Sequence, residues 1–92
     1  MPQVFKLQGY SVYFWSLEGH PLEPVHVHIS KGIPSKTGTK VWITENGKCL
    51  LANNKSHIPA KALRNIMDII EARSFEIIKQ WHDYHGEISY YC

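Results

Sequence analysis

The hydrophobic period of the chain changes once, near residue 59. Before that point, short runs alternate apolar and β-branched residues with polar ones, which predicts β-strands. From Pro59 on, a stripe recurs at alternating steps of four and three residues, which predicts helix with one buried face. The stripe consists of Leu63, Met67, Ile70, Ser74, Ile77, Trp81 and Tyr84. The change of period predicts an α+β fold with a strand-rich part over 1–55 and a helical part over 59–86.

The strand-rich part divides into five expected strands. They cover residues 4–7, 10–16, 24–31, 39–44 and 49–52. The last two are joined by Asn46-Gly47, which between apolar runs is the strongest short-range signal for a hairpin. We therefore expect an antiparallel sheet of four or five strands, with C-terminal helices packed on one face.

The helical part is too long for one straight helix in a small globule. From Pro59 to His85 a single helix would measure about 40 Å. A chain of this length has a radius of gyration of about 12 Å. We expect the helix to break near residues 73–75 and to end at Gly86, because glycine readily takes the left-handed conformation that closes a helix.

Ninety-two residues are enough for one domain, 1–92, and 43% apolar residues can bury a core without disulfides or metal. The net charge is only +2, and the nearest thing to a basic cluster is Lys31, Lys36 and Lys40 in a loop. This distribution of charge lacks the extended basic patch that is typical of nucleic-acid-binding proteins. We expect no signal peptide, no membrane segment and no bond between Cys49 and Cys92, and therefore a cytoplasmic protein.

Two histidines lie on the same side of the strand expected over 24–31. Its alternation places Val25, Val27 and Ile29 on one side and His26, His28 and Ser30 on the other. We expect the aliphatic set to face the core and the two imidazoles to face outward, about 6–7 Å apart at Cα. The candidate binding surface on this outward face consists of His26, His28, Trp42, Trp15 and Tyr13. The alternative is that a helix or the C-terminal tail covers this face and makes it a second small core.

Three interpretations of the two histidines are open. They can be structural, hydrogen-bonded to Glu18 or Glu23. They can be catalytic, with His26 and His28 as general acid and base and a lysine stabilising the transition state, because imidazole titrates near neutral pH.

The third interpretation is a metal site, since imidazole nitrogens are common zinc ligands. The further ligands would come from Glu18, His20, Glu23, His82 or His85. We expect neither a metal nor a cofactor, because the two histidine pairs lie more than fifty residues apart and no metal-binding motif joins them.

Several short motifs resemble a known family. They are Met1-Pro2, Gly9-Tyr10, Glu23-Pro24, His26-Val27-His28, the segment 59–70 and the segment from Trp81 to Gly86. In these the chain resembles the small bacterial family known only as domain of unknown function 4160. It departs from the family pattern at Val25, where a second proline is usual, and in a longer loop over 31–38. The resemblance implies a small bacterial or phage protein, often encoded beside another small protein in toxin–antitoxin-like or defence-linked modules.

From these observations we predict a protein that binds a macromolecule through its His/aromatic sheet face. The first candidate for the partner is a protein, and RNA, DNA or a second copy of the chain are further possibilities. We expect no binding to a membrane. The alternative is a small histidine-dependent nuclease or hydrolase, with or without a metal ion. Whether the chain is an enzyme is left open at this point.

Overall fold

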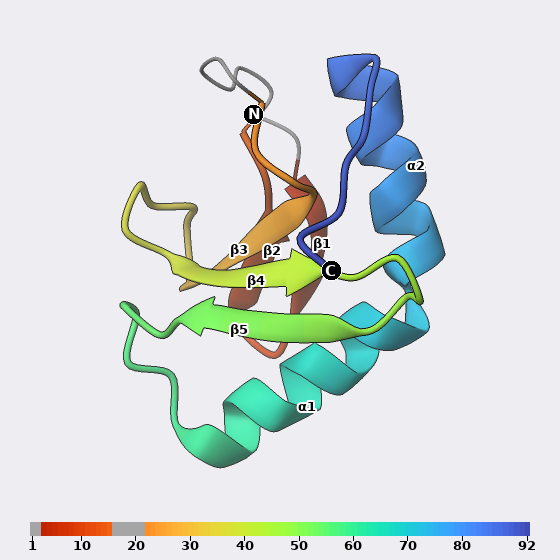
Figure 1. The fold of residues 1–92 in the computed structure, drawn as a ribbon. Coiled ribbons are helices and arrows are strands. Elements are labelled where there is room, and N and C mark those ends of the chain that lie inside the picture. The colour runs from red at the N-terminus through yellow and green to blue at the C-terminus, as the bar shows by residue number, and fades with distance from the viewer. Residues whose placement is uncertain (1–2, 16–21) are drawn as a thin grey trace.

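The computed structural model describes residues 3–15 and 22–92 and shows a sheet followed by two helices (Figure 1). The elements are β1 (Gln3–Leu7), β2 (Tyr10–Tyr13), β3 (His26–Lys31), β4 (Thr39–Ile43), β5 (Cys49–Asn53), α1 (Ala60–Ala72) and α2 (Ser74–His85). This order confirms the α+β fold.

The five strands form one antiparallel sheet in the order β1-β2-β3-β4-β5. Each strand therefore pairs with its neighbour in sequence, and β1 and β5 form the two edges. The Asn46-Gly47 turn joins β4 to β5, and Gly47 has φ 79°, which costs glycine little. In the middle of the sheet, Val27 lies opposite Val41.

The helical part breaks at Arg73, inside the predicted window. Arg73 has φ −111° and ψ 16°, outside helical values, and its N–H donates to the carbonyl of Ile69 at 3.0 Å. The second helix ends at Gly86 in the left-handed conformation, as predicted. The bend keeps the molecule compact, with a radius of gyration of 12.0 Å.

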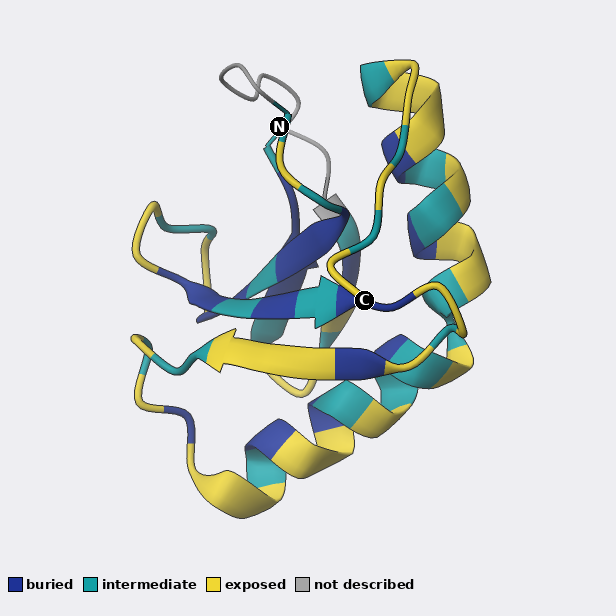
Figure 2. Cartoon of the chain, viewed as in Figure 1, coloured by how far each residue is buried: buried dark blue, intermediate teal, exposed yellow. Residues whose placement is uncertain are grey.

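Both helices bury the middle of their predicted stripe, Leu63 and Ile70 on α1 and Ile77 and Trp81 on α2, as the dark segments in Figure 2 show. The fully enclosed core includes Val27, Ile29, Val41, Ile43, Ile66, Ile70, Ile77 and Trp81. Tyr84, the last member of the stripe, is 57% exposed. None of the helices within residues 3–15 and 22–92 is long and apolar enough to cross a membrane.

The C-terminal tail, residues 87–92, returns from the end of α2 to the sheet (Figure 1). The amide of Val25 donates to the carbonyl of Ser89 at 2.9 Å, and the amide of Glu45 donates to the carbonyl of Cys92 at 3.0 Å. The tail thus lies over the start of β3 and the end of β4 without forming a regular strand.

Candidate functional site

Six rings form a continuous row, called the aromatic row below, which includes residues of β2, β3 and β4, Trp15 just after β2, and a residue of the tail. In order they are Trp15, Tyr13, His28, His26, Trp42 and Tyr91. Their successive centroids are 5.6, 5.6, 5.0, 5.7 and 4.9 Å apart. The row follows from the sheet register, because Tyr13 pairs with His28 and His26 pairs with Trp42 across neighbouring strands.

The five residues of the candidate binding surface are therefore brought together, but they differ in exposure. Trp15, His28 and Trp42 are half-buried, whereas Tyr13 is 0% exposed and His26 is 1% exposed. The expectation of an outward, accessible face is wrong for these last two.

The burial of His26 has two causes. Its ring lies 5.1 Å from the ring of Trp81 on α2, and the tail is hydrogen-bonded to Val25 directly before it. Figure 1 shows α2 beside the end of the sheet at which β3 begins. From that position Trp81 of α2 reaches the face of β3 that carries His26, which strand alternation predicts to be exposed to solvent.

His26 is held as a neutral ring. Burial is the main cause that lowers its pKa from 6.5 to about 4, with smaller contributions in the same direction from His28 and Lys40. Its Nδ1 lies 2.9 Å from the carbonyl oxygen of Pro24. Since a carbonyl can only accept, Nδ1 carries the proton and donates it. His26 therefore serves as a buried support for the rings on either side of it.

One ring nitrogen of His28 has no hydrogen-bond partner among residues 3–15 and 22–92. Its ring stacks on Tyr13 with an interplanar angle of 28°. Burial lowers the pKa of His28, and a hydrogen bond to the backbone of Gly38 opposes that shift. Within the described part of the chain, its Nδ1 is buried and unpaired. A neutral imidazole with a free nitrogen can accept a proton or a hydrogen bond.

Tyr13 anchors the loop between β3 and β4, a role that sequence reasoning missed. Its hydroxyl lies 2.7 Å from Oγ of Ser30 and accepts the amide of Ser35 at 2.9 Å. Gly38 passes so close that a Cβ there would lie 2.3 Å from this hydroxyl. Tyr13 thus fixes the loop beside His28 and has no exposed surface for a ligand.

A charged pair borders the row at Trp42. Nζ of Lys40 lies 2.6 Å from Oε1 of Glu23 and 4.2 Å from the centroid of the Trp42 ring. The hydrogen bond from Lys40 lowers the pKa of Glu23. Sequence reasoning considered Glu23 as a histidine partner, but its carboxylate pairs with Lys40, which lies opposite His28 across β3 and β4.

Tyr91 belongs to the aromatic row but was not among the residues of the predicted binding surface. Its ring lies nearly parallel to Trp42, with an interplanar angle of 5°, and the residue is 60% exposed. A pair of tyrosines at 90 and 91 could have indicated a tail with an apolar anchor. Nothing local, however, predicts a contact with a tryptophan 49 positions earlier.

The histidines do not gather into a metal centre in the described ranges. His82 is exposed, and the ring of His85 packs on Trp81 at 4.3 Å. Among residues 3–15 and 22–92, no three His, Cys, Asp or Glu side chains lie close enough to hold a metal ion. Glu18 and His20, two of the ligands considered, lie outside the described residues. The absence of a metal therefore stays a prediction.

The comparisons with known proteins identify a family. Neither a curated protein nor a solved structure matches the chain. Residues 9–82 match the model of a family described as a domain of unknown function (DUF4160). The matched part includes the strands β2 to β5, the whole of α1 and most of α2. The chain therefore belongs to the DUF4160 family.

Proposed function

We propose that the chain is a protein-binding module, and that it contacts its partner through the accessible rings of the aromatic row. Those rings are Trp15, His28, Trp42 and Tyr91. In line with the sequence resemblance, the module belongs to a toxin–antitoxin-like or defence-linked gene pair and works in the cytoplasm. The observation that carries the proposal is the half-exposed Trp42 ring, stacked on Tyr91 and capped by the ammonium of Lys40.

Trp42 has the properties of an interface hot spot. Tryptophan and tyrosine are enriched among the residues that contribute most to protein–protein affinity. The neighbouring ring and cation restrict the side chain before binding, so little rotamer entropy is left to lose. Leu50, 43% exposed, pairs with Trp42 across β4 and β5 and extends the apolar surface.

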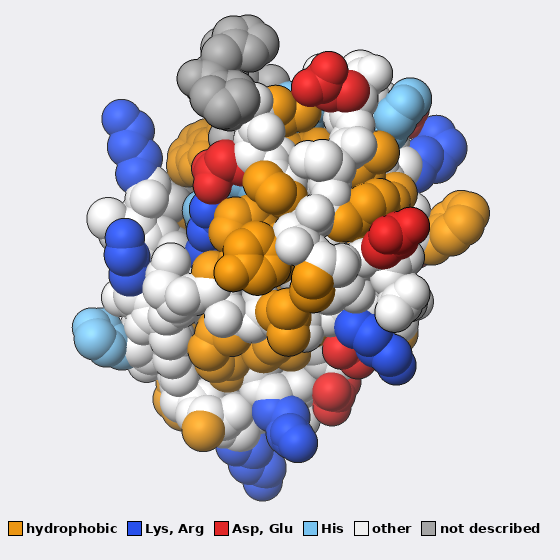
Figure 3. Space-filling model, in the orientation of Figure 1, with side chains coloured by type: hydrophobic (Ala, Val, Ile, Leu, Met, Phe, Trp, Pro, Cys, Tyr) orange, Lys and Arg blue, Asp and Glu red, His pale blue; other side chains and the backbone are white. Residues whose placement is uncertain are grey.

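A protein partner fits this surface better than a nucleic acid. Figure 3 shows hydrophobic side chains gathered over the face that carries β4, β5 and the tail, with charged side chains mostly around them. The only cation described next to the row, Lys40, is already paired with Glu23. With a net charge of +2, the chain lacks the concentrated positive charge that phosphate backbones require.

The test is capture of the partner from the native cell with three variants of the tagged chain. Trp42→Ala and Tyr91→Ser change the proposed surface, and the second changes a side chain that is 60% exposed. Phe75→Ala is the matched control, because it removes an 84% exposed aromatic ring from α2. Mass spectrometry identifies the captured proteins, and circular dichroism verifies that each variant is folded.

We expect one protein to be captured in a stoichiometric amount by the wild type and by Phe75→Ala. Its yield should fall about tenfold or more with Trp42→Ala and with Tyr91→Ser. Equal capture by all folded variants would contradict the proposed surface. Capture of nucleic acid in place of a protein would contradict the partner class.

A histidine-dependent nuclease is the second candidate function, and the half-buried position of His28 opposite Lys40 favours it. Because the pKa of His28 lies below 6.5, its ring is a neutral base at neutral pH. Lys40 lies across the strands from it and would balance charge on a phosphate by exchanging its ion pair with Glu23 for one with the substrate. The buried His26 would act through His28 and not on the substrate.

Cleavage of host RNA by the purified chain tests this candidate. If it holds, His28→Asn abolishes cleavage while the control His82→Asn, at an exposed position of α2, retains it. Because burial lowers the pKa of His28, acidification should abolish cleavage at a lower pH than the titration of an ordinary histidine would. Absence of cleavage by the wild type, or equal cleavage by both variants, would remove the nuclease from consideration.

A further inference from the structure

The outer edge of β5 faces a groove formed with α1. β5 pairs with β4 on one side only, and most of its residues are exposed, as the yellow arrow in Figure 2 shows. The groove has a volume of about 380 Å³ and is lined by Cys49, Ala60, Leu63, Arg64, Met67, Asp68 and Glu71. A volume of this size lies within the range of about 300–1,000 Å³ that holds ligands in proteins.

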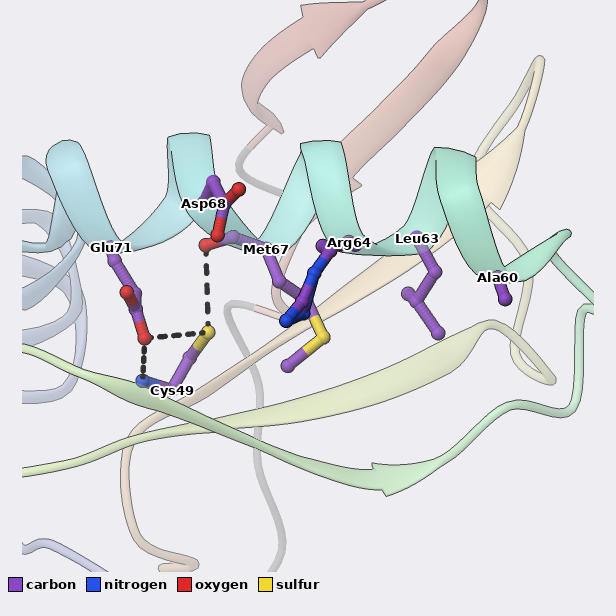
Figure 4. A pocket seen from close by; sticks show the side chains of 7 residues that line it. All are labelled: Cys49, Ala60, Leu63, Arg64, Met67, Asp68 and Glu71. Carbon is purple, nitrogen blue, oxygen red and sulfur yellow. Dashed lines mark hydrogen bonds between the residues drawn. The ribbon is translucent and has the colours of Figure 1, made fainter.

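The edge of β5 still offers backbone groups for pairing. The amide of Cys49 points away from β4 and donates to Oε1 of Glu71 at 3.2 Å, as drawn in Figure 4. Residues 49 to 51 pair with β4 in regular register. Because backbone groups alternate in direction along a strand, Leu51 presents its N–H and C=O on the same outer edge as Cys49.

The residues of β5 do not protect this edge against pairing. Natural edge strands are usually blunted by charges, proline or a covering segment. Between Lys48 and Lys55 the chain carries no charged residue, and Leu50 and Leu51 are 43% and 44% exposed. An exposed, uncharged, apolar edge beside a helix is the arrangement in which proteins bind an extended peptide as an added strand.

We propose that this groove binds an extended, basic–apolar peptide segment of a partner protein, which pairs with the edge of β5. An apolar side chain of the peptide packs on Leu63 and Met67. A lysine or arginine of the peptide pairs with Asp68 and Glu71, the two carboxylates that outnumber Arg64 among the charged residues lining the groove. The carbonyl of the peptide replaces Glu71 as acceptor for the Cys49 amide, so the Glu71 carboxylate becomes free to pair with the basic side chain.

A single peptide suits the groove better than a second copy of the chain. α1 runs beside the same edge of β5 (Figure 1), and six of the seven residues that line the groove belong to this helix. In a symmetric pair of copies, each β5 would bring its own α1 to the shared edge, and the two helices would compete for the space of one strand. The proposal does not depend on the aromatic row.

The experiment selects seven-residue peptides from a random phage-displayed library against the full chain. Enriched peptides are synthesised, and their affinities are measured for the wild type, for Asp68→Lys and for Asp83→Lys. Asp83 is the matched control, an exposed aspartate on α2 that is paired with Lys79. Amide NMR of the wild type then gives the shifts and the hydrogen exchange at Cys49 and Leu51.

We expect enriched peptides with apolar residues and lysine or arginine at alternating positions. Asp68→Lys should weaken their binding at least tenfold, and Asp83→Lys should leave it within twofold. Binding should shift the amides of Cys49 and Leu51 and slow hydrogen exchange at Leu51.

Three results would overturn the proposal. They are recovery of no enriched peptide, equal binding by both variants, and amide shifts confined to the aromatic row. A fourth result would assign the edge of β5 to a second copy of the chain and would also overturn the proposal. It is protection of the Leu51 amide in the absence of peptide, increasing with protein concentration in parallel with dimer formation in ultracentrifugation.

Discussion

The buried His26 predicts a folded state that weakens when the solution becomes mildly acidic. In the folded chain its pKa is about 4, against 6.5 for an unperturbed histidine. Between these two values the unfolded chain binds a proton that the folded chain does not. The contribution of His26 to the free energy of unfolding is therefore constant above about pH 6.5 and is lost as the pH falls toward 4.

The size of this effect follows from the two pKa values. One pKa unit corresponds to about 1.4 kcal/mol, so the full loss is about 3 kcal/mol, and most of it is reached by about pH 4.5. A small domain is stabilised by about 5–15 kcal/mol in total, so this loss is large. The lowered pKa values of His28 and His85 act in the same direction.

The assay is urea unfolding followed by tryptophan fluorescence, at about pH 7 and about pH 4.5. The wild type is compared with His26→Gln, which cannot titrate, and with His82→Gln, which changes an exposed histidine of α2. We expect the wild type and His82→Gln to lose about 2–3 kcal/mol more on acidification than His26→Gln does. An equal loss in all three would refute the assignment of His26 as a buried neutral ring.

Three further predictions follow from the core and its neighbours. Trp81→Ala should cost about 3–5 kcal/mol in denaturant unfolding, and a cost below about 0.5 kcal/mol would contradict its place in the core. Gly38→Ala should cost about 1–3 kcal/mol in the same assay, because the new Cβ meets the hydroxyls of Tyr13 and Ser30 and the carbonyl of Ile29; a cost below about 0.5 kcal/mol would contradict this close packing. A maleimide should label exposed Cys92 long before Cys49, whose buried thiol has its pKa raised to about 12, and equal rates in mass spectrometry would exclude this.

The parts of the fold that depend on local sequence were predicted. The Asn46-Gly47 hairpin needs only two residues between apolar runs, and the stripe of the helices shows in the spacing of their apolar residues. The break at Arg73 is less local, but its approximate position followed from comparing the helix length with the size of a globule. That the five predicted site residues share one face of the sheet could also be predicted, because this depends only on strand alternation and on the pairing of neighbouring strands.

The covering of that face could not be predicted from alternation. A strand pattern shows which side chains share a face, but it does not show which distant segment packs on them. His26 is buried because Trp81 reaches it from beside the end of the sheet and because the tail crosses at Val25. Both contacts join residues more than fifty positions apart, and neither leaves a periodic signal in the sequence.

The most direct test of the account is the affinity of the purified partner for the chain, measured by calorimetry. Trp42→Ala is compared with Phe75→Ala, so that each variant loses one solvent-accessible aromatic ring and only one of them loses a member of the aromatic row. We predict that Trp42→Ala raises Kd by about thirtyfold, which corresponds to about 2 kcal/mol for a hot-spot residue, and that Phe75→Ala changes Kd less than about threefold. Equal values of Kd for the two folded variants would contradict a binding surface on the aromatic row.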